Sequence, residues 1–289
     1  MCRALAYLDQ PVQLDHLLFQ SDSALIRQSY LPKMPHRLNL AGFGMRAWDR
    51  HSFDAGKPFS YASTSLPVFD RNLKAPAEKI QPTCLLAHVR DVAYCTEVDS
   101  PLQNVHPFQY EGFKLALAHN GDLASMREMK PLLLQYLKQD VAMRICGTTD
   151  SEWIYALLAS QLDDPMQHCS ADELDGAVDR TLAVIREVRA QLAAMRYCLD
   201  FGCYRTEDPA KVHEANMNFL SLWYTSGREY GCYDGEWKMS GGADVADSIM
   251  IASEPLSRDT SAWLEVPEHS MINADTRNAH PSVEIHYLS

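Results

Sequence analysis

The sequence lacks long hydrophobic runs, clustered basic residues and paired cysteines, and each absence excludes a class of protein. Its uninterrupted apolar runs are only a few residues long, whereas a membrane-spanning helix needs about 20. Asp9, Gln10, Asp15 and His16 interrupt the first apolar stretch, so we expect no secretory signal and no membrane partner. The chain carries 26 Lys and Arg against 38 Asp and Glu, with no basic run, which argues against nucleic-acid binding.

The eight cysteines show no spacing that suits a metal centre. There is no Cys-x-x-Cys pair and no Cys/His spacing typical of a tetrahedral zinc site. We therefore expect no metal and no other cofactor. Without a secretory signal, these residues indicate free thiols in a reducing cytoplasm.

No repeat and no Pro/Gly/Ser-rich linker divides the chain. Its 289 residues are 46% hydrophobic and 22% charged, the composition of a globular protein rather than a disordered, collagen-like or disulfide-stapled one. This length suits one large domain or two small ones, and the lack of a linker favours one.

Short apolar runs predict strands at both ends of the chain and helices in the middle. A strong turn signal, Asn120-Gly121, ends one of these runs. On the dipeptide alone, an ordinary hairpin turn is the favoured interpretation. The predicted strands lie in residues 38–49, 84–89, 115–119, 217–224 and 248–252.

Two capping-box spacings predict the helices. Thr149 and Glu152 precede an apolar run, and Ser170 and Glu173 precede a longer amphipathic one. The inward face of the second helix is predicted to contain Leu174, Ala177, Val178, Thr181, Leu182, Ile185, Val188 and Leu192. The basic side chains of that helix are expected on its solvated face.

Cys2 is the most informative single position. Methionine is trimmed from a chain when the next residue is small, which would leave Cys2 with both a thiol and a free α-amine. The thiol pKa is about 8.5 and the amine pKa about 7.7 to 8.0, so the amine can accept the thiol proton near neutral pH. One residue would then supply nucleophile and base. The alternative is an incidental buried thiol at the start of a strand.

Five short motifs follow one another along the chain. They are Cys2, Ala87-His88-Val89-Arg90, Asn104-Val105-His106-Pro107-Phe108, Ala118-His119-Asn120-Gly121 and Thr149-Asp150-Ser151-Glu152. In this order they resemble the class II glutamine amidotransferases, which are N-terminal nucleophile hydrolases. Further matches are Gly42-Phe43-Gly44-Met45, Asn218-Phe219 and Ile251-Ala252-Ser253-Glu254-Pro255-Leu256. The opening MCRALAY and the run TTDSE resemble the stand-alone branch that includes the γ-glutamyl hydrolase of the ergothioneine pathway.

The resemblance implies a fold and a domain layout. The fold is α+β, a four-layer αββα sandwich of two antiparallel sheets flanked by helices. The amidotransferase-type domain would span residues 2–272, and residues 273–289 would form a C-terminal edge strand or tail. The predicted order of elements along the chain, with strands first, helices next and strands again at the end, is compatible with this architecture but does not identify it.

The resemblance also implies roles for individual residues. Cys2 would attack the amide, and Asn120 and Gly121 would donate hydrogen bonds to the tetrahedral oxyanion. Arg90 would bind the substrate α-carboxylate through its planar fork, and Asp150 the α-ammonium. The alternatives are a surface cation for Arg90 and an N-terminal helix acid for Asp150.

The motif histidines are assigned to structure rather than chemistry. His106 matches a family position that we interpret as structural, with a role near the substrate left open. His88 and His119 are interpreted as packing residues. A Cys-His pair of the papain type is unnecessary where the nucleophile carries its own amine.

The sequence departs from the family after Arg90, where Asp91-Val92-Ala93-Tyr94-Cys95 replaces the usual aromatic and small residues. Asp91 is expected to face away from Arg90 if the strand continues. The segment 225–245, with Tyr230, Cys232, Tyr233 and Trp237, is interpreted as an addition that shapes acceptor or partner contacts.

The function predicted is hydrolysis of the side-chain amide of glutamine or of a γ-glutamyl small molecule by a stand-alone domain. One alternative is an ammonia-supplying subunit, which requires a separate synthetase chain. Another is a non-catalytic domain that senses glutamine. A homodimer is left open.

Overall fold

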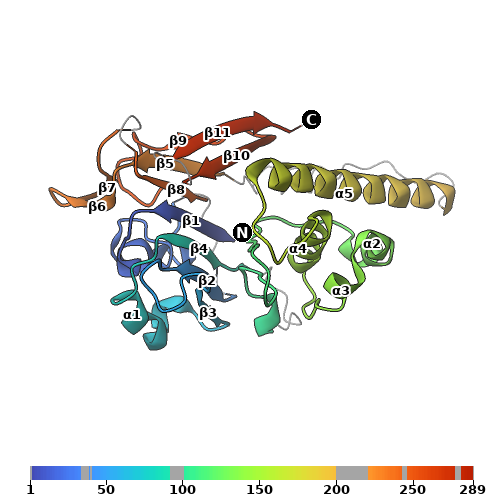
Figure 1. Ribbon diagram of the computed structural model, residues 1–289, viewed down its shortest axis with the longest axis horizontal. Coiled ribbons are helices and arrows are strands. Elements are labelled where there is room, and N and C mark those ends of the chain that lie inside the picture. Colours follow the sequence, from blue (N-terminus) through green and yellow to red (C-terminus); the bar gives the residue numbers. More distant parts are fainter. Residues whose placement is uncertain are drawn as a thin grey trace. The chain divides into compact units, whose positions relative to one another are not determined.

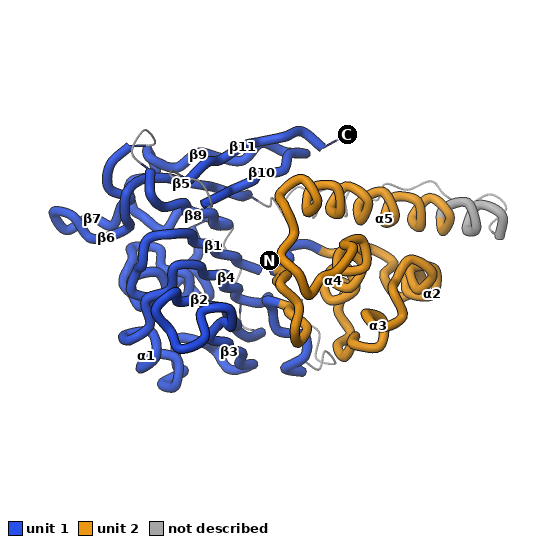
Figure 2. Tube along the Cα trace, viewed as in Figure 1, with its two compact units in different colours: residues 1–107, 118–121, 220–289 blue, residues 108–117, 122–219 orange. Residues whose placement is uncertain are grey.

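The computed structural model describes residues 2–33, 39, 41–91, 101–199, 221–242, 246–276 and 281–288, with side chains left out at 193–199. The chain forms two compact units (Figure 2). The first comprises residues 1–107, 118–121 and 220–289, and the second residues 108–117 and 122–219. No helix in the described part of the chain is long and apolar enough to cross a membrane.

The first unit is built on a seven-stranded antiparallel sheet with the strand order β3-β2-β4-β1-β8-β5-β9. Figure 1 shows β2, β4, β1 and β8 side by side. The strands of this sheet are β1 (Arg3–Asp9), β2 (Phe43–Trp48), β3 (Phe59–Ser63), β4 (Cys84–Val89), β5 (Trp223–Gly227), β8 (Ser248–Ala252) and β9 (Leu264–Glu265).

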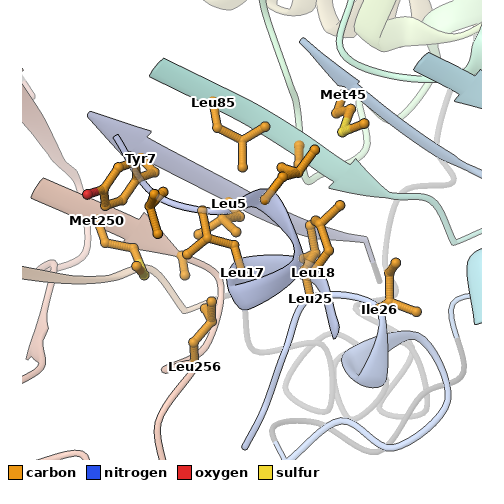
Figure 3. Packing of buried hydrophobic residues seen from close by; sticks show 14 of the residues in the cluster. Leu5, Tyr7, Leu17, Leu18, Leu25, Ile26, Met45, Leu85, Met250 and Leu256 are labelled. Atoms are coloured by element: carbon orange, nitrogen blue, oxygen red, sulfur yellow. The ribbon is translucent and has the colours of Figure 1, made fainter. Parts of the chain in front are cut away.

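One face of this sheet packs against the segment that follows β1. Leu5 and Tyr7 alternate along β1 and are fully buried, as expected for a strand with one covered face. Leu17 and Leu18 come from the short π-helical turn η1 (His16–Gln20) and lie in the same cluster (Figure 3). The described residues of this unit also contain the 3-10 turns η2 (Arg27–Ser29), η3 (Pro67–Phe69) and η4 (Leu102–Asn104) and helix α1 (Arg71–Ala77).

Two further two-stranded sheets belong to the first unit. They pair β6 (Tyr230–Tyr233) with β7 (Glu236–Met239), and β10 (Ser270–Asp275) with β11 (Ser282–Tyr287). The β6–β7 hairpin contributes to the core, because buried Tyr230 donates a hydrogen bond to Ser21 at 2.9 Å and Trp237 packs on His16. At least part of the segment 225–245 therefore stabilises the fold.

The second unit is helical. Its elements are α2 (Met126–Leu133), η5 (Leu134–Tyr136), α3 (Gln139–Ala142), α4 (Asp150–Gln161) and α5 (Ala171–Leu199). Helix α4 is buried on nearly all sides and packs against α2 and α5. On α5, Ala177, Thr181, Ile185 and Val188 are buried and Arg180, Arg186 and Arg189 are exposed, which confirms the predicted faces.

The Thr149 cap is confirmed, although the capping box is not reciprocal. The Thr149 hydroxyl accepts a hydrogen bond from the Glu152 N–H at 3.3 Å. The buried Glu152 carboxylate instead accepts from the N–H groups of Cys146 at 2.9 Å and Gly147 at 2.6 Å. It thereby fixes the loop that leads into α4.

The α+β class is confirmed, but the described residues form one large sheet and two small ones rather than two large sheets face to face.

The strand predicted at 115–119 is wrong in extent, because only Leu117 pairs there, in an isolated bridge to Phe108. β5 begins at Trp223, near the end of the strand predicted at 217–224, of which residues 217–220 lie outside the described residues. The boundary predicted after residue 272 falls inside β10.

Candidate active site

Cys2 lies immediately before β1, partly exposed and outside any disulfide. Its Sγ atom accepts a hydrogen bond from the Asp91 N–H at 3.4 Å, and the thiol donates a longer one to the Asp91 carbonyl oxygen at 3.9 Å. A backbone N–H directed at sulfur stabilises the thiolate, which is the nucleophilic form, relative to the thiol. The site therefore supplies a donor to the proposed nucleophile from the backbone.

Arg90 follows directly on β4 and is positioned by the sheet. Its N–H donates to the Gly42 carbonyl at 2.8 Å, and its own carbonyl accepts from the Ala41 N–H at 3.0 Å. The β1–β4 register pairs Arg3 with Val89, and one further step along both strands brings Cys2 opposite Arg90. Only 7% of Arg90 is exposed, so its charge is largely shielded from solvent.

The Asn120-Gly121 turn is tied to the same strand through His88. The His88 Nε2 atom lies 3.2 Å from the His119 carbonyl oxygen. Since a carbonyl oxygen only accepts, Nε2 carries the proton in this bond. The His119 ring also covers Gly121, where an added Cβ would come within 2.8 Å of Nε2. A larger residue at Gly121 would displace that ring.

Two of the motif histidines form a buried pair. The rings of His88 and His106 are 4.2 Å apart. Burial lowers the pKa of His88 to about 3, and nearby Arg90 acts in the same direction. Burial also lowers the pKa of His106 strongly. Both imidazoles are therefore neutral at neutral pH beside the Arg90 cation, a proximity that reasoning from sequence missed.

Asp150 belongs to the second unit, at the first turn of α4. Its Oδ2 accepts from the Leu123 N–H at 2.7 Å, and Oδ1 accepts from the Ser151 N–H at 2.8 Å. Leu123 follows Gly121 by two residues, so Asp150 holds the chain just after the predicted oxyanion turn. The helix-terminus interpretation accounts for this placement, and a role in substrate binding stays a prediction.

The structure thus joins four of the predicted site residues in one unit by a chain of contacts. Cys2 contacts Asp91, which adjoins Arg90, and His88 on β4 contacts His119, which adjoins Asn120 and Gly121. No group of three or more His, Cys, Asp or Glu side chains that could hold a metal occurs among the described residues. Residues 92–95 of the departure after Arg90 lie outside those residues.

Comparison with known proteins shows similarity to one family over part of the chain. Residues 71–199 match the model described as "Glutamine amidotransferases class-II", a range that contains Arg90, Asn120, Gly121 and Asp150 but not Cys2. The chain is 27% identical to the probable glutamine amidotransferase DUG3 of Saccharomyces cerevisiae, over 99% of this chain and 86% of the yeast protein.

The chain is an enzyme similar to the class II glutamine amidotransferases.

Two further similarities bear on this amidotransferase-like enzyme. It is 33% identical to the amidophosphoribosyltransferase of Methanothermobacter thermautotrophicus over 89 residues, which cover 30% of this chain and 17% of that protein. A solved glutamine aminotransferase class-II domain protein from Silicibacter pomeroyi superposes with a TM-score of 0.55 at 16% identity and full coverage of both chains. The structural likeness shows the fold alone.

Proposed function

We propose that this enzyme hydrolyses the side-chain amide of glutamine or of a γ-glutamyl compound through a Cys2 thioester, as a stand-alone domain. The observation that carries the proposal is the contact chain from the Cys2 sulfur through Asp91 and Arg90 along β4 to His88 and the His119 carbonyl. It brings a thiol, a guanidinium and the predicted oxyanion turn into one compact unit.

The reaction begins at Cys2 after removal of Met1. The α-amine takes the thiol proton, and the thiolate attacks the δ-carbonyl carbon of the substrate. Asn120, through its side-chain amide, and Gly121, through its N–H, donate to the resulting oxyanion. The protonated amine returns the proton to the leaving nitrogen, and ammonia or an amine departs.

Hydrolysis of the thioester completes the cycle. Water adds to the acyl carbon with the Cys2 amine as base, the thiolate leaves and takes the proton back from the amine, and glutamate is released. Arg90 pairs with the α-carboxylate, and Asp150 with the α-ammonium. These two contacts would select γ-glutamyl compounds over simple amides.

The range of substrates that the enzyme hydrolyses is tested by comparing ammonia release from glutamine with amine release from larger γ-glutamyl amides. A strong preference for γ-glutamyl amides supports the stand-alone hydrolase. Hydrolysis detected only after a synthetase chain is added would instead support the ammonia-supplying subunit. Glutamine binding without turnover of any amide would support the sensing domain and contradict the proposal. Cys2→Ala serves as the inactive control.

A further inference from the structure

A buried arginine lies directly beside the proposed nucleophile. Arg3 is the first residue of β1, and its Nη1 donates a hydrogen bond to the Cys2 carbonyl at 3.1 Å. Its side chain is only 3% exposed, and its Nε lies 3.8 Å from Oε2 of Glu254, which is 1% exposed. A charged pair is therefore enclosed next to Cys2.

The sheet brings this pair together. The β1–β8 register pairs Leu5 with Ala252. At the next position, the Ser253 N–H donates to the Ala4 carbonyl at 3.0 Å, and the Ala4 N–H donates to the Ser253 hydroxyl at 3.0 Å. One further step in the same direction brings Arg3 opposite Glu254, which lies just beyond the end of β8, and opposite charges attract at such positions.

Glu254 is fixed by further donors. Its carboxylate accepts from the Ser23 hydroxyl at 2.9 Å and from the Lys33 N–H at 3.2 Å to each oxygen. These bonds hold the carboxylate in one orientation. The Arg3 guanidinium, attracted to that carboxylate, is held in turn against Cys2.

Stability alone does not explain a buried ion pair at this position. Removing both charges from water is costly, and well-packed apolar residues at such sites are often equally or more stabilising. Burial lowers the pKa of Arg3, whereas the charges of Glu254 and Cys2 raise it. A guanidinium nevertheless stays protonated in proteins, so Arg3 presents a permanent positive charge to Cys2.

We propose that Arg3, held by Glu254, is a positioning residue for Cys2: it fixes the Cys2 carbonyl, orients the attached thiol and α-amine, and stabilises the thiolate. This inference rests on the proposed function, because it assigns Cys2 the role of nucleophile. It adds a cation that the motif residues Arg90, Asn120, Gly121 and Asp150 do not supply.

The test measures how fast iodoacetamide alkylates Cys2 as a function of pH, resolved by peptide mass spectrometry. The exposed thiols Cys146 and Cys232 report in the same sample as references. Arg3→Met should slow Cys2 alkylation at neutral pH about tenfold, the effect of about one unit of pKa, and should move its pH midpoint upward. Glu254→Gln should also slow Cys2 alkylation, because it removes the partner that holds Arg3. Arg3→Lys should restore part of the Cys2 alkylation rate that Arg3→Met loses.

Two controls separate positioning from folding. The double variant Arg3→Met/Glu254→Met leaves no lone buried charge, so it should regain thermal stability relative to the single variants while Cys2 stays slow. Arg50→Met removes an exposed pair with Asp9 at the other end of β1 and should leave the Cys2 rate unchanged.

Two results would overturn the inference. One is a wild-type alkylation profile in Arg3→Met. The other is a double variant that recovers both stability and Cys2 reactivity, which is the signature of a purely structural pair. Because alkylation needs no substrate, this outcome is separate from that of the proposed function, which fails if the wild-type protein hydrolyses no γ-glutamyl amide.

Discussion

His88 and His106 show how single buried side chains shape the surroundings of Arg90. Burial keeps both imidazoles neutral, so they add no positive charge next to the guanidinium. His88 also donates to the His119 carbonyl, and a protonated ring would require a second acceptor at Nδ1, which is buried and has no hydrogen-bond partner among the described residues. Neutral histidines therefore add no charge that would compete with Arg90 for a substrate carboxylate.

The lowered pKa of His88 predicts a loss of stability in acid. Its pKa is about 3 in the folded chain against an ordinary 6.5, so below pH 6.5 the unfolded chain binds the extra proton. The contribution of neutral His88 to the free energy of unfolding is fully present above about pH 6.5. It is lost as the pH falls toward about 3, by up to about 1.4 kcal/mol per pH unit.

Urea unfolding of wild type and His88→Gln between pH 7.5 and 5.5 measures this effect. The free-energy difference between the two proteins should shrink as the pH falls, because only the wild type must keep that imidazole neutral. A free-energy difference for His88→Gln that does not change with pH would contradict the account.

Asn120 should affect the rate rather than the binding of substrate. Loss of one oxyanion donor costs about 3 kcal/mol, so Asn120→Ala should lower kcat by about 100- to 1,000-fold. Its KM should change little, because the oxyanion exists only during the reaction. Steady-state kinetics, with Asn72→Ala on the exposed face of α1 as control, test this, and an unchanged kcat would remove Asn120 from the site.

At the level of elements, β2 carries a glycine because another segment crosses it closely. A Cβ at Gly44 would lie 2.1 Å from the His106 carbonyl oxygen and 3.0 Å from Val105. The backbone at 105–106 therefore packs directly on the strand. This contact positions His106 beside His88, and it is possible only because Gly44 has no side chain.

Gly44→Ala should therefore destabilise the fold. The added methyl group meets backbone rather than a flexible side chain, and such overpacking costs about 1 to 3 kcal/mol or more. Thermal unfolding measures the loss. Gly242→Ala, where nothing lies within 4 Å of the added carbon, should stay within about 0.5 kcal/mol of wild type. Equal stabilities for the two variants would contradict the close crossing.

The sequence predicts those elements whose pattern is local. Residues 84–89 and 248–252 are strands at the predicted bounds, because their apolar runs match strands buried within a sheet. Thr149 caps the start of α4, as its side chain predicts. Of the strand predicted at 115–119, only one isolated β-bridge forms, because strand pairing depends on a partner segment that a local pattern does not reveal.

At the scale of the whole molecule, the division into units separates the predicted site residues. Cys2, Arg90, Asn120 and Gly121 belong to the first unit and Asp150 to the second (Figure 2). The lack of a linker predicted one domain, but composition does not reveal that the chain crosses between two cores several times. Nor does it reveal the Arg3–Glu254 pair, whose members are 251 positions apart and meet only through the β1–β8 register.

The central claim is that Cys2 is the nucleophile. Incubation with a glutamine-mimicking diazo ketone, followed by peptide mass spectrometry, tests it most directly. The account predicts a single adduct on Cys2 of a chain that has lost Met1, and no adduct in Cys2→Ala. Labelling at another cysteine, or an active chain that retains Met1, would contradict it.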